Sequence, residues 1–67
     1  MFESDAHDWC VRWARIHRDN VTAHDHRAGG GKIVIFNWST HYRYAEADRW
    51  VDAYRALAAF EGRRANV

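Results

Sequence analysis

Residues 32–38 read Lys-Ile-Val-Ile-Phe-Asn-Trp, the stretch of the chain most typical of a β-strand. Its β-branched and aromatic side chains suit a pleated, half-buried surface, so the run predicts a buried strand. Before it, Gly29-Gly30-Gly31 supply the conformational freedom that a hairpin loop needs. The segment 21–26 on the other side of the glycines then predicts the first, less buried strand of a β-hairpin.

Amphipathic helices are predicted on both sides of the hairpin. Ser4 can cap the first helix, and a second one is expected to begin close to Ala45 and to stop at Gly62. In each segment the apolar residues recur every three or four positions. They are Ala6, Trp9, Cys10, Trp13, Ile16 and His17 in the first helix, and Ala47, Trp50, Val51, Tyr54, Leu57 and Ala58 in the second.

Residues 39–44 leave two interpretations open. The alternation of Tyr42 and Tyr44 with polar neighbours suggests a short third strand, and the alternative is a helix that already starts at Thr40. The predicted fold is therefore α+β in the order α-β-β-(β)-α, with two helices packed on one face of a small antiparallel sheet. A single domain is expected over residues 1–62, followed by a flexible basic tail at 63–67.

The composition favours a binding module. Of the 67 residues, ten are aromatic and nine are Arg, yet the net charge is only +1. Trp, Tyr and Arg anchor protein interfaces, whereas a nucleic-acid-binding protein built from them normally carries a clear positive excess. The single Cys10 excludes an intramolecular disulfide, no apolar run reaches the length of a membrane span, and the acidic N-terminus is unlike a signal peptide. These features predict a cytoplasmic protein without membrane contact.

The histidines and Cys10 are weak candidates for a zinc site. His24 and His26 would share one face of a strand, and His7 and Cys10 lie one helical turn apart. Because no paired CxxC or HxxxH spacing accompanies them, neither a metal site nor a cofactor is predicted. Cys10 on the apolar stripe instead suggests a buried thiol, and a zinc-stabilised mini-domain remains an alternative.

No motif indicates catalysis. The cysteine, the histidines and the carboxylates are not ordered by a nucleophile elbow or a metal-protease signature. The run Gly29-Gly30-Gly31-Lys32 is followed by Ile33 and a strand, whereas a phosphate-binding loop needs Ser or Thr and a helix at that point. The chain is therefore predicted not to be an enzyme.

Protein binding is the favoured function. One row of residues on the second helix has small residues in its middle. These permit close approach of a partner helix, or of a second copy in a homodimer. Alternatively, the row flanks a wide buried face. The expected activity is that of a small non-enzymatic binding protein, such as a phage or mobile-element inhibitor or regulator of a host protein complex. The row comprises Arg49, Ala53, Ala56 and Phe60, and the candidate partner-binding residues are Trp38, Tyr44, Arg49 and Phe60.

Nucleic-acid binding is the main alternative. Basic residues interleaved with Trp38, Tyr42 and Tyr44 suit base stacking and backbone contacts. The predicted order of elements, helix, three strands and helix, resembles a double-stranded-RNA-binding domain in outline and in length. The Lys-rich start of that family's second helix is replaced here by Ala-Glu-Ala-Asp at 45–48, which places acids where phosphate would approach. The candidate nucleic-acid-binding residues are Arg27, Lys32, Arg43, Arg63 and Arg64.

Overall fold

A computed structural model of the chain describes residues 1–17, 20–25 and 31–65. It confirms the predicted α+β fold, and the third strand is present. None of the helices in these described ranges is both long enough and apolar enough to cross a membrane. The elements in chain order are α1 (Glu3–His17), β1 (Val21–Asp25), β2 (Ile33–Asn37), β3 (Arg43–Ala47) and α2 (Trp50–Ala65).

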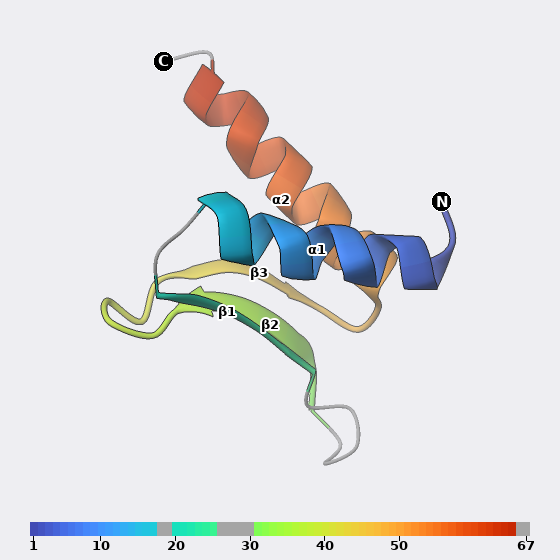
Figure 1. Cartoon of the computed structure of the whole chain (residues 1–67), viewed down its shortest axis with the longest axis horizontal. Helices are drawn as coiled ribbons and strands as arrows, with labels where there is room; N and C mark the ends of the chain where they lie inside the picture. The colour runs from blue at the N-terminus through green and yellow to red at the C-terminus, as the bar shows by residue number, and fades with distance from the viewer. Residues whose placement is uncertain (18–19, 26–30, 66–67) are drawn as a thin grey trace.

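The three strands form one antiparallel sheet in the order β1-β2-β3. Both helices lie on the same face of this sheet, with α1 crossing α2 (Figure 1). The pairing of β1 with β2 confirms the predicted hairpin, and residues 26–30 between the two strands lie outside the described residues. The other face of the sheet carries neither helix.

The core lies between the sheet and the helices. Ile33 and Ile35 of β2 are fully buried because alternate side chains of a strand point to one face. β2 is more buried than β1, as predicted. The buried residues are Ala6, Cys10, Trp13, Ala14, Ile33, Ile35, Ala45, Trp50, Ala53 and Leu57.

A bulge in β3 changes which side chains face the helices. Ile35 pairs with Ala45 but Phe36 pairs with Arg43, so Tyr44 is an extra residue in β3. Strict alternation would place Tyr44 on the open face beside Glu46. With the bulge, both Tyr44 and Ala45 pack against the core, while Arg43 and Glu46 are exposed.

The second helix differs from the prediction at both ends. It begins at Trp50 and not near Ala45, because residues 43–47 pair with β2 instead. It also continues through Gly62 to Ala65, so the glycine does not end the helix and Arg63 is helical. A glycine inside an exposed helix costs only about 1 kcal/mol relative to alanine, which tertiary packing overrides. The rest of the predicted tail, residues 66–67, lies outside the described residues.

The first helix also departs from the prediction in two details. It begins at Glu3, so Ser4 lies within the helix and does not precede it. Ile16, expected on the apolar stripe, is 65% exposed. The apolar side of α1 that packs against the core is narrower than the sequence pattern suggested. Cys10, Trp13 and Ala14 already fill the space between α1 and the sheet.

Candidate binding surface at the β2–β3 turn

The turn between β2 and β3 is held by hydrogen bonds to Asn37. Its side-chain Oδ1 accepts hydrogen bonds from the backbone N–H groups of Ser39 (2.9 Å) and Thr40 (3.0 Å), as in an Asx turn. The Asn37 carbonyl accepts a hydrogen bond from the His41 N–H (2.6 Å), and the Asn37 N–H donates to the Tyr42 carbonyl (2.8 Å). The backbone of the turn is therefore ordered without any partner.

Two large aromatic side chains are exposed on this turn. Trp38 is 55% and Tyr42 is 52% exposed, whereas Trp13 and Trp50 are only 3% exposed. The Trp38 N–H donates a hydrogen bond to the Asn20 carbonyl (3.1 Å), which ties the turn to the start of β1. His41 has a φ of 62°, in the left-handed region that few residues other than glycine adopt, and it allows the chain to reverse into β3.

Tyr42 also belongs to a group of stacked rings that extends into the core. We call Trp13, Tyr42, Tyr44 and Phe60 the aromatic cluster. The Tyr44 ring makes edge contacts with Tyr42, Phe60 and Trp13 at centroid distances of 5.0, 5.2 and 5.5 Å. Trp13 is only 3% exposed, so the cluster links a buried ring of α1 to an exposed ring of the turn. Such edge contacts add to the burial energy and hold the rings in place.

The structure divides the predicted partner-binding residues. Trp38 is exposed, but Tyr44 and Phe60, which were predicted to contact a partner, pack against the core. Ala53 is fully buried, and Ala56 and Phe60 pack against the core, so their row on α2 flanks the buried face. Tyr42, which the sequence analysis named only among the stacking aromatics of the nucleic-acid alternative, is 52% exposed and was missed as a partner-binding residue.

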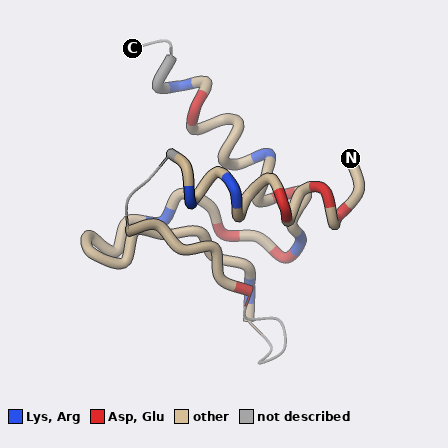
Figure 2. Tube along the Cα trace, viewed as in Figure 1, with Lys and Arg blue, Asp and Glu red and all other residues tan. Residues whose placement is uncertain are grey.

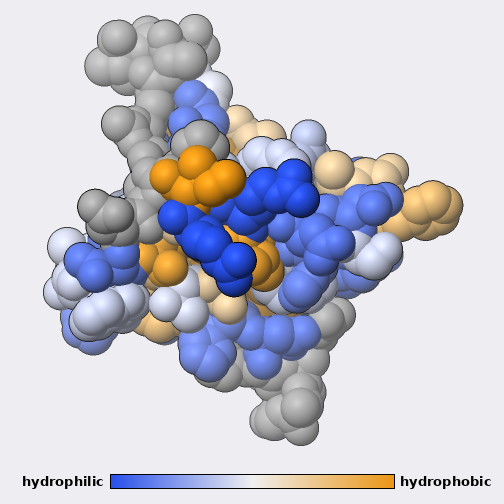
Figure 3. All heavy atoms as spheres, viewed as in Figure 1, coloured by the Kyte–Doolittle hydropathy of each residue, from blue (hydrophilic) through white to orange (hydrophobic). Residues whose placement is uncertain are grey.

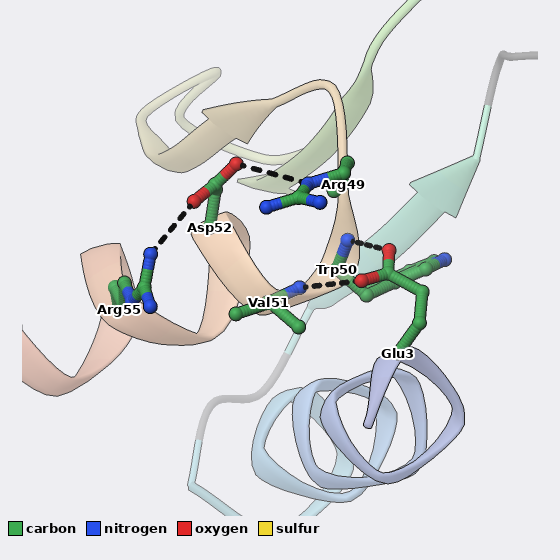
Figure 4. Close-up of polar contacts among 6 residues, drawn as sticks. All are labelled: Glu3, Arg49, Trp50, Val51, Asp52 and Arg55. Atoms are coloured by element: carbon green, nitrogen blue, oxygen red, sulfur yellow. Dashed lines mark hydrogen bonds and ion pairs between the residues drawn. The ribbon is translucent and has the colours of Figure 1, made fainter. Parts of the chain in front are cut away.

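Arg49, the remaining candidate, lies just before α2 and interacts within the chain. Its Nε is 3.7 Å from a carboxylate oxygen of Asp52, whose other oxygen is 3.3 Å from Arg55 (Figure 4). The Arg49 side chain is still 66% exposed. Contact between Arg49 and a partner stays a prediction. The charge of Arg49 is partly balanced by Asp52.

The N-terminus of α2 is capped by a residue of α1. The carboxylate of Glu3 accepts hydrogen bonds from the backbone N–H groups of Trp50 and Val51, the latter at 3.2 Å (Figure 4). A helix N-terminus attracts anions through these free N–H groups and the helix dipole. Since Glu3 already satisfies two of them, a phosphate group would have to displace an intramolecular carboxylate.

The predicted nucleic-acid-binding residues do not gather in one place. Lys32 stands just before β2, whereas Arg43 pairs with Phe36 near the far end of that strand. At about 3.3 Å per residue these positions are roughly 13 Å apart along the sheet. Arg43 also forms an ion pair with Glu46. Figure 2 shows basic and acidic positions intermixed over the described chain.

The other candidates of this set lie apart. Arg63 is exposed near the end of α2, and Arg64 follows it in the same helix. Arg27 lies outside the described residues. The described positions therefore form no single basic stripe.

A shallow hollow of about 290 Å³ lies on the open face of the sheet next to the turn. It is lined by Val34, Phe36, His41 and Arg43, so it shares His41 with the turn. The His24 ring stacks on Phe36 at a centroid distance of 6.4 Å and an interplanar angle of 17°. The hollow thus has an apolar floor with imidazole and guanidinium groups at its edge.

The candidate zinc ligands are separated by the sheet. Cys10 is fully buried in the core, on the side of the helices, whereas His24 stacks on Phe36 on the open face. His7 packs edge-on against the Trp50 ring at 4.7 Å. No cluster of three metal-ligating side chains occurs among the residues described, and His26 lies outside them.

Cys10 is poorly suited to nucleophilic chemistry. Burial, with a smaller contribution from the Glu3 charge, raises the pKa of its thiol to about 12. The thiolate is the reactive form of cysteine, and it is scarce at neutral pH when the pKa is this high.

No family model, curated protein or solved structure matches this chain.

Proposed function

We propose that this chain is a small non-enzymatic binding protein that engages a protein partner through the β2–β3 turn. The observation that carries the proposal is the exposure of Trp38 and Tyr42, each more than half accessible, on a turn whose backbone is held by Asn37. Trp and Tyr are the residue types most often found as energetic anchors of interfaces.

The ordering of the turn favours binding. A flexible loop loses conformational entropy when it is immobilised by a partner, whereas this turn is already fixed by its own hydrogen bonds. Tyr42 is further supported by its ring contacts with Tyr44 and Phe60. A partner would therefore meet a turn with a fixed backbone and a Tyr42 ring that is already held in place.

The surroundings of the two aromatic residues suit the rest of an interface. Ser39, Thr40 and His41 are exposed polar residues between them, and the hollow at Phe36 adjoins. A standard interface buries about 800 Å² on each partner. That is about a sixth of the accessible surface of 4675 Å², so an interface of standard size would take in the adjoining sheet face as well as the turn.

A role in occluding or bridging a larger complex fits the exposed aromatic residues of the turn. In the part of the chain that the structure describes, Trp38 and Tyr42 lie on one turn, so the protein would act by covering a site on its partner. We propose an inhibitor or regulator of a host protein complex, of the kind that phages and mobile elements encode.

The distribution of charge supports a protein partner over a nucleic acid. Glu3 occupies the N-terminus of α2, and Glu46 neutralises Arg43. A nucleic-acid interface would instead need several free cations along one path of phosphates.

The proposal is tested by affinity capture with the tagged chain from a bacterial lysate. The capture is run with and without nuclease and washed at low and high salt, with the wild-type chain beside Trp38→Ala/Tyr42→Ala. Phe2→Ala is the matched control, because Phe2 is 79% exposed at the N-terminal end, away from the turn (Figure 1).

A discrete protein that survives nuclease and high salt, is retained by Phe2→Ala and is lost with the double variant is the expected result. Recovery of nucleic acid that disappears at high salt would contradict the proposal. Equal capture by the double variant would show that the turn is not the binding surface.

A further inference from the structure

The solvent-facing side of α1 carries its charges in an ordered sequence. Asp5, Asp8, Arg12 and Arg15 are spaced by three or four residues, which places them along one line of the helix. All four are exposed. The acids therefore occupy the N-terminal half of this line and the arginines the C-terminal half, as the red and blue segments of α1 show in Figure 2.

Among the described residues, the charges of this line are less balanced by ion pairs than Asp52 of α2 is. Asp52 lies within 4 Å of two arginines. On α1, the ion-pair contact of Asp8 within the described ranges is with the neighbouring imidazole of His7 at 3.0 Å, and the Asp8 side chain is 71% exposed. Within the part of the chain that the structure describes, neither Arg12 nor Arg15 forms an ion pair.

Apolar side chains are exposed at both ends of the same helix. Phe2 (79%) and Met1 (65%) lie at its start, and Ile16 (65%) lies near its end. Shallow hollows along the helix are lined by Arg12, Arg15 and Ile16, together with Val11. In the region where α1 lies, Figure 3 shows hydrophobic surface directly beside strongly hydrophilic surface.

This arrangement is complementary to itself when one helix is reversed. If the exposed sides of two copies of α1 lie antiparallel about a two-fold axis midway between Asp8 and Arg12, Asp5 faces Arg15 and Asp8 faces Arg12, twice over by symmetry. The same reversal brings Phe2 of one copy to the end of the helix that carries Ile16 of the other. We propose that α1 is a self-association surface, and that its partner is α1 of a second copy of this chain.

A second copy fits this surface better than other partners. A nucleic acid or an anionic membrane would be attracted by Arg12 and Arg15 but repelled by Asp5 and Asp8. A two-fold symmetric pair requires that one patch be complementary to itself, which the reversed order of charges provides. Small domains also gain stability from association.

The proposed dimer is weak and salt-sensitive. A helix of 15 residues is about 22 Å long, so the contact is small. Its ion pairs lie at an exposed surface, where salt screens them. The proposal is independent of the proposed function, because the turn with Trp38 and Tyr42 is not part of this face.

Sedimentation equilibrium of the full chain, from micromolar to millimolar concentration at low and high salt, tests the proposal. The wild-type chain is expected to dimerise at low salt, with a dissociation constant that rises roughly tenfold or more at high salt. A chain that stays monomeric at millimolar concentration and low salt would overturn the proposal.

Charge reversal identifies the surface. Arg12→Glu/Arg15→Glu and Asp5→Lys/Asp8→Lys are each expected to be monomeric, because like charges then face each other. An equimolar mixture of the two is expected to form a heterodimer, since one line is then wholly acidic and the other wholly basic. Arg63→Glu, an exposed arginine of α2, is the matched control and should dimerise like the wild type.

Circular dichroism verifies the fold of each variant. If Asp5→Lys/Asp8→Lys does not fold, Ile16→Ser is used in its place. Ile16→Ser and Arg12→Glu/Arg15→Glu are then each expected to weaken the dimer. Dimerisation that is unchanged in these variants, or a mixture of folded variants that stays monomeric, would overturn the assignment to α1.

Discussion

Glu3 caps the N-terminus of the helix that begins at Trp50, although the two residues are 47 positions apart in the chain. The contact joins the first turn of α1 to the first turn of α2, and the same carboxylate also accepts a hydrogen bond from the Val51 N–H (3.2 Å). Only two residues separate the end of β3 from the start of α2, and the cap lies at that start. One side chain thus links two helices that are distant in the sequence.

Replacing Glu3 by Ala is expected to destabilise the protein. Loss of a helix cap costs about 0.5–2 kcal/mol, and in a domain of this size 1 kcal/mol lowers Tm by roughly 4–8 °C. Thermal melting followed by circular dichroism measures the change. Asp5→Ala is the control, because Asp5 also lies in the first turn of α1 but is exposed. Equal losses in both variants would show that the cap adds nothing.

Phe60 and Trp38 are expected to differ in their effect on stability. Phe60→Ala removes a half-buried ring that contacts Tyr44 and Trp13, and it should cost about 1–3 kcal/mol, less than a fully buried Phe. Trp38→Ala should change stability by no more than about 0.5 kcal/mol, because its side chain is mostly exposed. Urea denaturation compares the two. A large loss in Trp38→Ala would assign that ring to the core and contradict its proposed role.

Ala53 is expected not to tolerate a larger side chain. It is fully buried, so Ala53→Leu should destabilise by about 1–3 kcal/mol through overpacking. Ala58→Leu is the same substitution at an exposed position of the same helix and should be nearly neutral. Urea denaturation of the two variants provides the comparison. If Ala53→Leu were as stable as Ala58→Leu, the row would be open to a partner after all.

Cys10 should make stability depend on alkaline pH. Burial raises the pKa of its thiol from 9.0 to about 12, so the native state holds this proton more tightly than the unfolded chain. The resulting stability is fully present below pH 9.0 and is lost as pH rises towards about 12. Denaturation midpoints in this window should therefore fall more steeply for the wild type than for Cys10→Ala. Parallel curves would contradict the prediction.

The sequence predicted the order of elements because hydrophobic periodicity reports local structure well. The strand at 33–37 and both helices carry clear patterns, and the structure confirms them. The boundary between β3 and α2 was wrong, because residues 45–47 can belong to a helix or to a strand by pattern. Long-range pairing with β2 and the Glu3 cap decide between them, and neither is visible in a local window.

The candidate site was only partly predictable. The exposure of Trp38 followed from its place at the end of a strand. The bulge at Tyr44 turns that ring towards the core and leaves Tyr42 as the exposed member of the aromatic cluster. A bulge depends on the register between strands, so the sequence could not show which of the two tyrosines faces solvent.

Hydrogen–deuterium exchange of the chain with and without its captured partner tests the assignment of the β2–β3 turn. The partner is expected to slow exchange in the segment 37–44, which contains Trp38 and Tyr42, and to leave exchange in α1 unchanged at concentrations where the chain is monomeric. Protection confined to other elements, with the exchange of 37–44 unaltered, would contradict the assignment of the β2–β3 turn as the binding surface.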